Sequence, residues 1–196
     1  MQIGVVSDTH NNLKNIDTII SLFNKEDINF VIHTGDVTNA NALEKFSKLK
    51  CKLIGVYGNN DRNEKGLKEV ALKHNFIFQE PPNSISLHNR NIAIFHEPDI
   101  IDNFLVNNDG IDIVIHGHTH RYRQEIKDNT LIFNPGESAG MLEGSNAVGL
   151  VDLITLATRR IFFWSLNIQL KKEYQEAGLI LKASKLLKKS FALKIY

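Results

Sequence analysis

The stretch QIGVVSDTHNNLKNIDTIISLFN, residues 2–24, decides the fold class. It opens with a short β-branched run, passes through a polar cluster and then places apolar residues three or four apart, namely Leu13, Ile16, Ile19, Ile20 and Phe23. This spacing predicts a helix with one buried face and an N-cap at Asn11 or Asn12. A strand that leads directly into a helix is the building unit of an α/β protein.

Similar runs recur along the chain. Weaker helical patterns occupy residues 39–50 and 64–75, and short apolar runs that close on polar clusters lie at 29–36, 52–61, 91–97, 112–120, 130–137, 146–155 and 159–166. The early alternation of strand and helix predicts parallel strands. The later half is richer in strands, and SISLHNRNIAIF indicates a hairpin that turns at 88–91. We therefore expect an α/β/β/α arrangement, in which a second, more antiparallel sheet packs on the first and helices flank this two-sheet sandwich.

Composition places the chain among ordinary globular proteins. Its 196 residues are 42% hydrophobic and 23% charged, and a net charge of +1 gives no electrostatic indication of nucleic-acid binding. The single cysteine, Cys51, excludes an intramolecular disulfide and fits a reducing compartment. The N-terminal MQIGVVSDTH lacks the pattern of a signal peptide, and no apolar run approaches the roughly 18 residues of a membrane span. These features predict a cytoplasmic protein.

The last part of the chain is a compositional unit of its own. Residues 165–196 contain seven lysines and two glutamates, a net charge of +5 that leaves −4 for residues 1–164. Leu179, Ala183, Leu186, Leu187 and Phe191 recur at helical spacing among the lysines. We predict a body of residues 1–165 and a basic amphipathic tail of residues 166–196. This tail can pack on the body, form a homo-oligomer or lie on an anionic membrane.

Polar side chains with metal-binding chemistry follow five of the predicted strands. They are Asp8, His10, Asp36, Asn59, Asn60, Asp61, His96, His118 and His120. In open α/β sheets, ligands bind at the carboxyl ends of the strands, so these side chains are expected to converge on one rim. Nitrogen and oxygen ligands without a thiolate suit Mn, Fe, Co, Ni or Zn rather than a structural cysteine-type zinc site.

Spacing and number support a metal centre. Asp8 and His10 are two residues apart, as are His118 and His120, and on an extended backbone such pairs point to the same face. Seven candidate ligands exceed the needs of one metal but suffice for two if a carboxylate bridges them. Two cations roughly 3.5–4 Å apart stabilise the attacking and leaving oxygens of a phosphoryl displacement and activate water at neutral pH.

The blocks SDTH, GDVTN, GNND and GHTH, together with the isolated His96, resemble the calcineurin-like metallophosphoesterase superfamily and within it the small YfcE-type phosphodiesterases. The resemblance covers about residues 1–165 and implies the two-sheet sandwich. It also implies that Asp8, His10, Asp36 and His120 hold one metal, and that Asp36, Asn59, His96 and His118 hold the other. Asp36 would bridge them. The expected cofactor is a pair of divalent ions, manganese first, with nickel, iron, zinc, cobalt and magnesium as alternatives.

The activity that the resemblance implies is hydrolysis of a small phosphodiester by metal-activated hydroxide, with Asn60 and Asp61 as catalytic residues. Many family members have a histidine, a proton donor to the leaving group, where this chain has Asn60. An amide can hydrogen-bond a phosphate oxygen but cannot donate a titratable proton, which favours diesters with good leaving groups. Cyclic nucleotides, glycerophosphodiesters and nucleic-acid ends all remain open as substrates.

Other residues near the blocks have less defined roles. His116 is expected to pack beside the site, and Asn134 and Glu137 to line it. Glu97 stands where glycine is common, either adding charge beside the second metal or facing solvent. The alternative function is a non-catalytic interaction scaffold like the retromer subunit of this fold. The complete set of seven ligand positions favours the enzyme, because the scaffold lacks some of the histidines.

Overall fold

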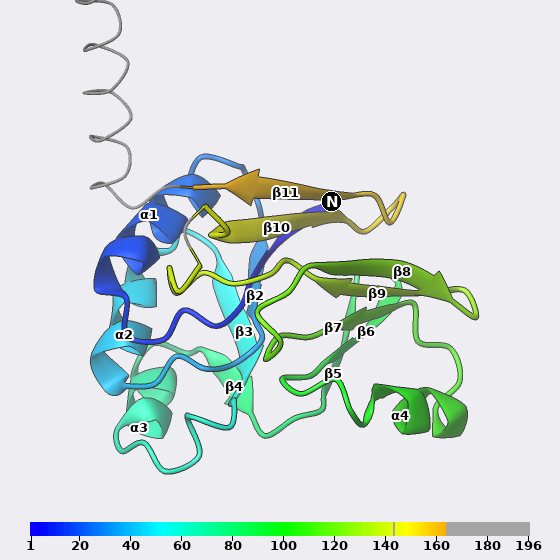
Figure 1. Cartoon of the computed structure of the whole chain (residues 1–196), viewed down its shortest axis with the longest axis horizontal. Helices are drawn as coiled ribbons and strands as arrows, with labels where there is room; N and C mark the ends of the chain where they lie inside the picture. The colour runs from blue at the N-terminus through cyan, green and yellow to red at the C-terminus, as the bar shows by residue number, and fades with distance from the viewer. Residues whose placement is uncertain (143, 164–196) are drawn as a thin grey trace, which may run out of the picture. The chain divides into compact units, whose positions relative to one another are not determined.

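The computed structural model describes residues 1–142 and 144–163, which form two sheets with helices on their outer faces (Figure 1). One sheet contains β1 (Gln2–Val6), β2 (Phe30–His33), β3 (Lys52–Val56), β4 (Ile77–Gln79), β10 (Ala147–Asp152) and β11 (Thr158–Phe162). The other contains β5 (Asn83–Leu87), β6 (Arg90–Ile94), β7 (Ile113–Ile115), β8 (Arg123–Lys127) and β9 (Thr130–Asn134). The helices are α1 (Leu13–Phe23), α2 (Ala40–Lys45), α3 (Leu67–Lys73) and α4 (Ile101–Asn107), and a 3₁₀ turn, Phe46–Lys48, follows α2. The predicted α/β two-sheet sandwich is confirmed.

The six-stranded sheet has the order β11-β10-β1-β2-β3-β4, with β1 to β4 parallel and β10 antiparallel to both neighbours. The five-stranded sheet has the order β5-β6-β7-β9-β8 and is mixed rather than mainly antiparallel. We expected the later strands to form the second sheet, but β10 and β11 return to the first. The reason is burial, because Val148 and Leu150 face the helices while Val151 faces the other sheet. A strand buried on both faces needs this inner position beside β1.

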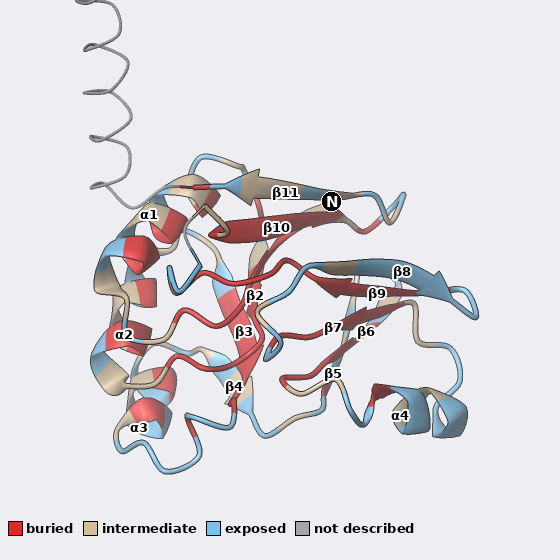
Figure 2. Cartoon of the chain, viewed as in Figure 1, coloured by how far each residue is buried: buried red, intermediate tan, exposed pale blue. Residues whose placement is uncertain are grey.

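Three clusters of apolar side chains fill the spaces between the layers, and most buried residues lie there (Figure 2). Val6 and Val31 pack on the buried face of α1, which includes Ile16. Between the sheets, the alternate residues of β1 and β2 meet side chains of β6, β7 and β9. On the far side, Phe95 packs against Phe104 of α4. Because successive side chains of a strand point to opposite faces, one strand contributes apolar residues to the clusters on both sides of its sheet.

The predicted bounds agree with the structure for the first helix but not for the next two. For α1 the N-cap is Asn12, whose side chain accepts a hydrogen bond from the backbone N–H of Asn15 over 3.1 Å. α2 and α3 are shorter than the predicted 39–50 and 64–75, because α2 tightens into the 3₁₀ turn and α3 begins after Gly66, which has φ +86°. The hairpin between β5 and β6 is confirmed. Short β4, charged β8 and half-exposed α4 were not predicted.

Within these described segments, no helix is long and apolar enough to cross a membrane. The basic tail of residues 166–196 lies outside the described residues, so its role stays a prediction.

Candidate metal centre

The predicted ligands lie in loops that leave five strands of both sheets. Asp8 and His10 follow β1, Asp36 follows β2 and Asn59 follows β3, whereas His96 follows β6, and His118 and His120 follow β7. All seven are linked to one another by short contacts, and the structure therefore brings the whole predicted set together. Their role as metal ligands stays a prediction, which the geometry below supports.

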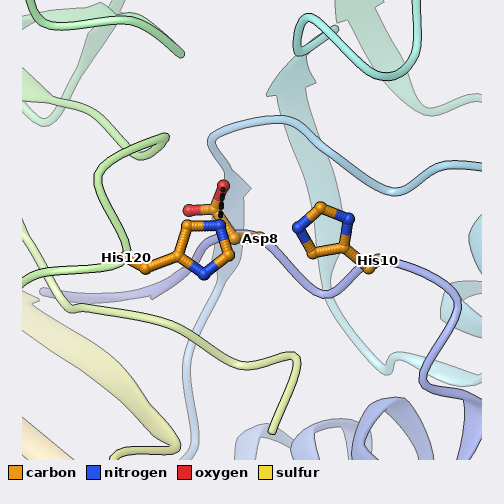
Figure 3. A group of neighbouring side chains, drawn as sticks. All are labelled: Asp8, His10 and His120. Carbon is orange, nitrogen blue, oxygen red and sulfur yellow. Dashed lines mark ion pairs between the residues drawn. The ribbon is translucent and has the colours of Figure 1, made fainter. Parts of the chain in front are cut away.

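The first group consists of Asp8, His10 and His120, whose potential ligand atoms lie within 4.8 Å of one another (Figure 3). Nε2 of His120 is 3.6 Å from Oδ1 of Asp8, and the rings of His10 and His120 are stacked with centroids 5.4 Å apart. Oδ1 of Asp8 and Nε2 of His10 are buried and have no hydrogen-bond partner within residues 1–142 and 144–163. Buried polar atoms without a partner are costly, and a divalent cation would satisfy both.

The second group surrounds His96. Its Nδ1 donates to the backbone carbonyl of Thr34 over 2.8 Å, which leaves Nε2 to face the site. That Nε2 lies 2.8 Å from Oδ1 of Asn59 and 3.3 Å from Nδ1 of His118. Nδ1 of His118 is itself 3.0 Å from the same Asn59 oxygen. One amide oxygen and two imidazole nitrogens thus converge, a donor set that suits a borderline divalent metal.

Asp36 lies between the two groups. Its Oδ2 is 4.0 Å from Nε2 of His10, and its Oδ1 is 3.4 Å from Nε2 of His96. The carboxylate therefore presents one oxygen to each group. This is the arrangement that a bridging ligand requires.

The backbone at the site corrects one step of our reasoning. We inferred that paired ligands share a face because the backbone is extended, but five of the ligands have left-handed φ values. These are Asp8 at 49°, His10 at 43°, Asp36 at 58°, His118 at 67° and His120 at 57°. Non-glycine residues rarely adopt this region, and such strain collects at functional sites. The side chains converge because sharp loops turn them inward.

Two glycines allow the loops to approach closely. A Cβ atom at Gly117 would overlap the Ser7 hydroxyl and lie 2.6 Å from Oγ1 of Thr34. A Cβ atom at Gly58 would overlap a carboxylate oxygen of Asp36. Both glycines of the GNND and GHTH blocks are therefore needed for packing of the ligand loops against one another.

The two expected catalytic residues have different surroundings. Asn60 is exposed, and its Nδ2 donates to Oδ2 of Asp36 over 2.7 Å. Asp61 is buried, and its oxygens accept backbone N–H bonds from Asp36 and Gly58, both at 2.8 Å, and from Thr38 at 2.7 Å. These bonds hold the loops after β2 and β3 together. The catalytic role that we expected for Asp61 stays a prediction, and these bonds support a positioning role for its carboxylate.

Residues around the ligands were anticipated only in part. His116 is buried as expected, and so is His33. Asn134 donates from Nδ2 to the carbonyl of Gly117 over 3.1 Å. Glu97 forms an ion pair of 3.1 Å with Arg62, a residue for which the sequence predicted no role. The hydroxyl of Ser7 donates to Asp8. The place of Ser7 next to Asp8 in the SDTH block could have predicted this contact.

Burial and charge shift the protonation of the site. Burial raises the pKa of Asp8, although the Ser7 hydrogen bond and nearby histidines oppose it. Burial also favours the neutral form of Asp36, but the hydrogen bond and charge of His96 outweigh this and hold the pKa of Asp36 well below its usual range. Burial lowers the pKa of His96, yet Asp36 and Asp8 more than compensate, and the net pKa is raised. Protons and cations thus compete for the same atoms.

Comparisons with solved structures support the fold. A structure described as that of a novel archaeal phosphodiesterase is 34% identical with a TM-score of 0.77, covering 83% of this chain and 100% of that one. The phosphoesterase YfcE from E. coli is 19% identical with a TM-score of 0.61, covering 82% and 98%. Vps29 from Entamoeba histolytica is 18% identical with a TM-score of 0.60, covering 84% and 100%. For the last two, the likeness concerns the fold alone.

Sequence comparisons extend over most of the chain. The protein named phosphodiesterase MJ0936, from Methanocaldococcus jannaschii, is 35% identical over 159 residues, which are 78% of this chain and 93% of that protein. A family model for the calcineurin-like phosphoesterase superfamily domain matches residues 1–155. This range contains every one of the predicted ligands. The chain therefore belongs to the calcineurin-like phosphoesterase superfamily.

Proposed function

We propose that the protein is a dinuclear metal-dependent phosphodiesterase. The observation that carries the proposal is the position of Asp36, which presents one carboxylate oxygen to His10 and the other to His96. In a two-metal site, a carboxylate placed between two imidazole groups can serve as the bridge between the metals. The name of the 35% identical relative, phosphodiesterase, supports the choice of substrate class.

Each part of the site has a proposed task. Asp8, His10 and His120 would hold one metal and Asn59, His96 and His118 the other, with Asp36 common to both. Bound divalent ions supply a polarised water and neutralise charge on the phosphate during displacement. A donor set of nitrogen and oxygen only suits Mn, Fe, Co, Ni or Zn, and the family resemblance makes manganese our first choice among them. Asp61 would keep the loops after β2 and β3 in place.

The residue at the leaving-group side supports diester hydrolysis. Asn60 has an exposed amide that can donate a hydrogen bond to a phosphate oxygen, but it carries no titratable proton. General acid catalysis contributes about 10²–10⁴-fold, so its absence favours phenolic and other good leaving groups. A small diester of this kind is the proposed substrate class.

A metal-by-substrate screen tests this function. Metal-stripped protein would be loaded separately with Mn²⁺, Ni²⁺, Co²⁺, Zn²⁺, Fe²⁺ or Mg²⁺ and assayed with bis(p-nitrophenyl) phosphate and p-nitrophenyl phosphate. We expect two metals per chain and faster turnover of the diester. A protein that binds two metals yet hydrolyses neither substrate would instead support the interaction scaffold, the alternative of the same fold. No feature of the described residues favours that alternative, since the ligand set is complete.

Two further proposals concern the chain as a whole. We propose that residues 1–165 form the catalytic body and that the basic tail of residues 166–196 mediates oligomerisation or packs on a body. We also propose a cytoplasmic location, because a chain with a single cysteine fits a reducing compartment.

A further inference from the structure

Glu137 is a fully buried carboxylate beside the candidate metal centre. It lies in the loop after β9 and is 0% exposed. No lysine or arginine within the described part of the chain forms an ion pair with it, and the one titratable partner there is His120. A buried carboxylate requires compensating hydrogen bonds, so the groups that satisfy Glu137 indicate what it does.

Its contacts divide between a ligand and a loop. Oε2 of Glu137 lies 3.3 Å from Nδ1 of His120 and accepts the backbone N–H of Met141 over 3.2 Å. Oε1 accepts the backbone N–H of Leu142 over 2.7 Å. One carboxylate thus satisfies an imidazole and two successive amides.

The contact with His120 sets the orientation of the ring. A carboxylate facing Nδ1 favours the tautomer that carries its proton there, which leaves the lone pair on Nε2. Nε2 is the atom that lies 3.6 Å from Oδ1 of Asp8, on the side of the first ligand group. Glu137 therefore turns His120 toward the position where a metal would be bound.

The contact with the loop holds the backbone of two exposed apolar residues. Met141 and Leu142 are 61% and 56% exposed, unusual for neighbouring large apolar side chains. Their backbone amides are held by the same carboxylate that faces His120. Exposed apolar side chains of this kind suit the aryl or otherwise apolar part of a diester.

We propose that Glu137 is a positioning residue that orients His120 toward metal and couples metal binding to the 138–142 loop. The inference rests on the proposed metal-dependent function and deepens it, since it assigns the loop as the substrate-facing rim. Coupling is reciprocal, so metal bound through His120 should strengthen the hold of Glu137 on the amides of Met141 and Leu142.

The test compares Glu137→Gln with the matched control Ser138→Ala. The glutamine keeps the size of the side chain but replaces one acceptor oxygen by an NH₂ group. That group cannot accept a hydrogen bond, so the contact with either His120 or a backbone N–H is lost. Ser138 is adjacent and equally buried, and its hydroxyl donates to the carbonyl of Ala147 over 3.0 Å without touching a ligand. Circular dichroism would confirm that each variant is folded.

Two readouts are needed besides activity. Calorimetric titration of metal-stripped protein with Mn²⁺ should show two sites in the wild type, and Glu137→Gln should weaken one of them about 10–100-fold. Hydrogen exchange of the 138–142 peptide should slow on metal addition in the wild type and in Ser138→Ala, but not in Glu137→Gln. Wild-type affinities in Glu137→Gln, or equal weakening in Ser138→Ala, would overturn the inference. A wild-type protein that binds no metal would instead overturn the proposed function.

Discussion

Asn60 donates a hydrogen bond from Nδ2 to Oδ2 of Asp36 over 2.7 Å, and its backbone N–H donates to Oδ1 of the same residue over 3.0 Å. The residue expected at the leaving-group side is therefore tied to the proposed bridge between the metals. The two roles are nevertheless separable, because one substitution can remove the bridging charge and another can change the donor beside it.

Asp36→Asn tests the bridge. The substitution removes the negative charge between His10 and His96, so metal content by elemental analysis should drop below two per chain and diesterase activity should fall at least 10²-fold, an order-of-magnitude estimate from the loss of metal catalysis. Asp17→Asn is the matched control, because Asp17 is 48% exposed and pairs only with surface lysines in the described segments. Two metals and full turnover in Asp36→Asn would refute the assignment.

Asn60→His tests the leaving-group position. A histidine restores a titratable donor, so the ratio of monoester to diester turnover should rise, by up to about 10²-fold if the proton is transferred effectively. Asn63→His places the same group on an exposed residue of the same loop and should leave the ratio unchanged. If metals remain bound in Asn60→His while the ratio does not move, Asn60 is not beside the leaving group.

Metal binding should weaken as the pH falls. The pKa values of His96 and Asp8 are raised in the metal-free site, so a cation must displace protons from both groups as the pH falls. For each group that must lose a proton, the apparent metal affinity falls about tenfold for every pH unit below the pKa of that group. Manganese retention after equilibrium dialysis should be lower at pH 6 than at pH 8. Equal retention, with peak activity near pH 5, would contradict this.

His33 should make stability depend on pH. Burial, reinforced by the charge of His96, lowers its pKa from the ordinary 6.5 to about 3. Between these values the unfolded chain binds the proton and the folded chain does not, so the free energy of unfolding falls as the pH drops below 6.5, by about 1.4 kcal/mol per pH unit. Urea denaturation of metal-free protein at pH 7 and pH 5 measures the total loss, to which His33 contributes roughly 2 kcal/mol. His33→Gln should remove that contribution, whereas His88→Gln, at an exposed turn, should not.

Deleting residues 167–196 tests the tail. All seven candidate ligands precede position 121, so metal content and diesterase activity should persist. Removing a segment with apolar residues at helical spacing should lower solubility or change the oligomeric state, measured by size-exclusion chromatography with light scattering. Loss of metals in a truncated protein that remains folded by circular dichroism would show that the tail belongs to the site.

The sequence alone determined the layer class and the membership of the candidate site. The β-branched run in residues 2–8 and the helical spacing of 12–24 predict one strand and one helix locally, since each pattern is a property of neighbouring residues. The five polar blocks at strand ends predicted which side chains converge, because strands bring their carboxyl ends to one rim. Their role as ligands stays a prediction.

Only the tertiary structure decided what depends on contacts distant in sequence. The return of β10 to the side of β1 follows from burial on both faces, which periodicity does not reveal. The ligands converge through left-handed loops rather than an extended backbone, and Asp61 holds backbone amides. Glu137 follows its own strand by three residues, yet its position against His120 arises only when β7 and β9 pair. Local sequence sets the elements, whereas the partner of a buried charge is chosen by the packing of the whole fold.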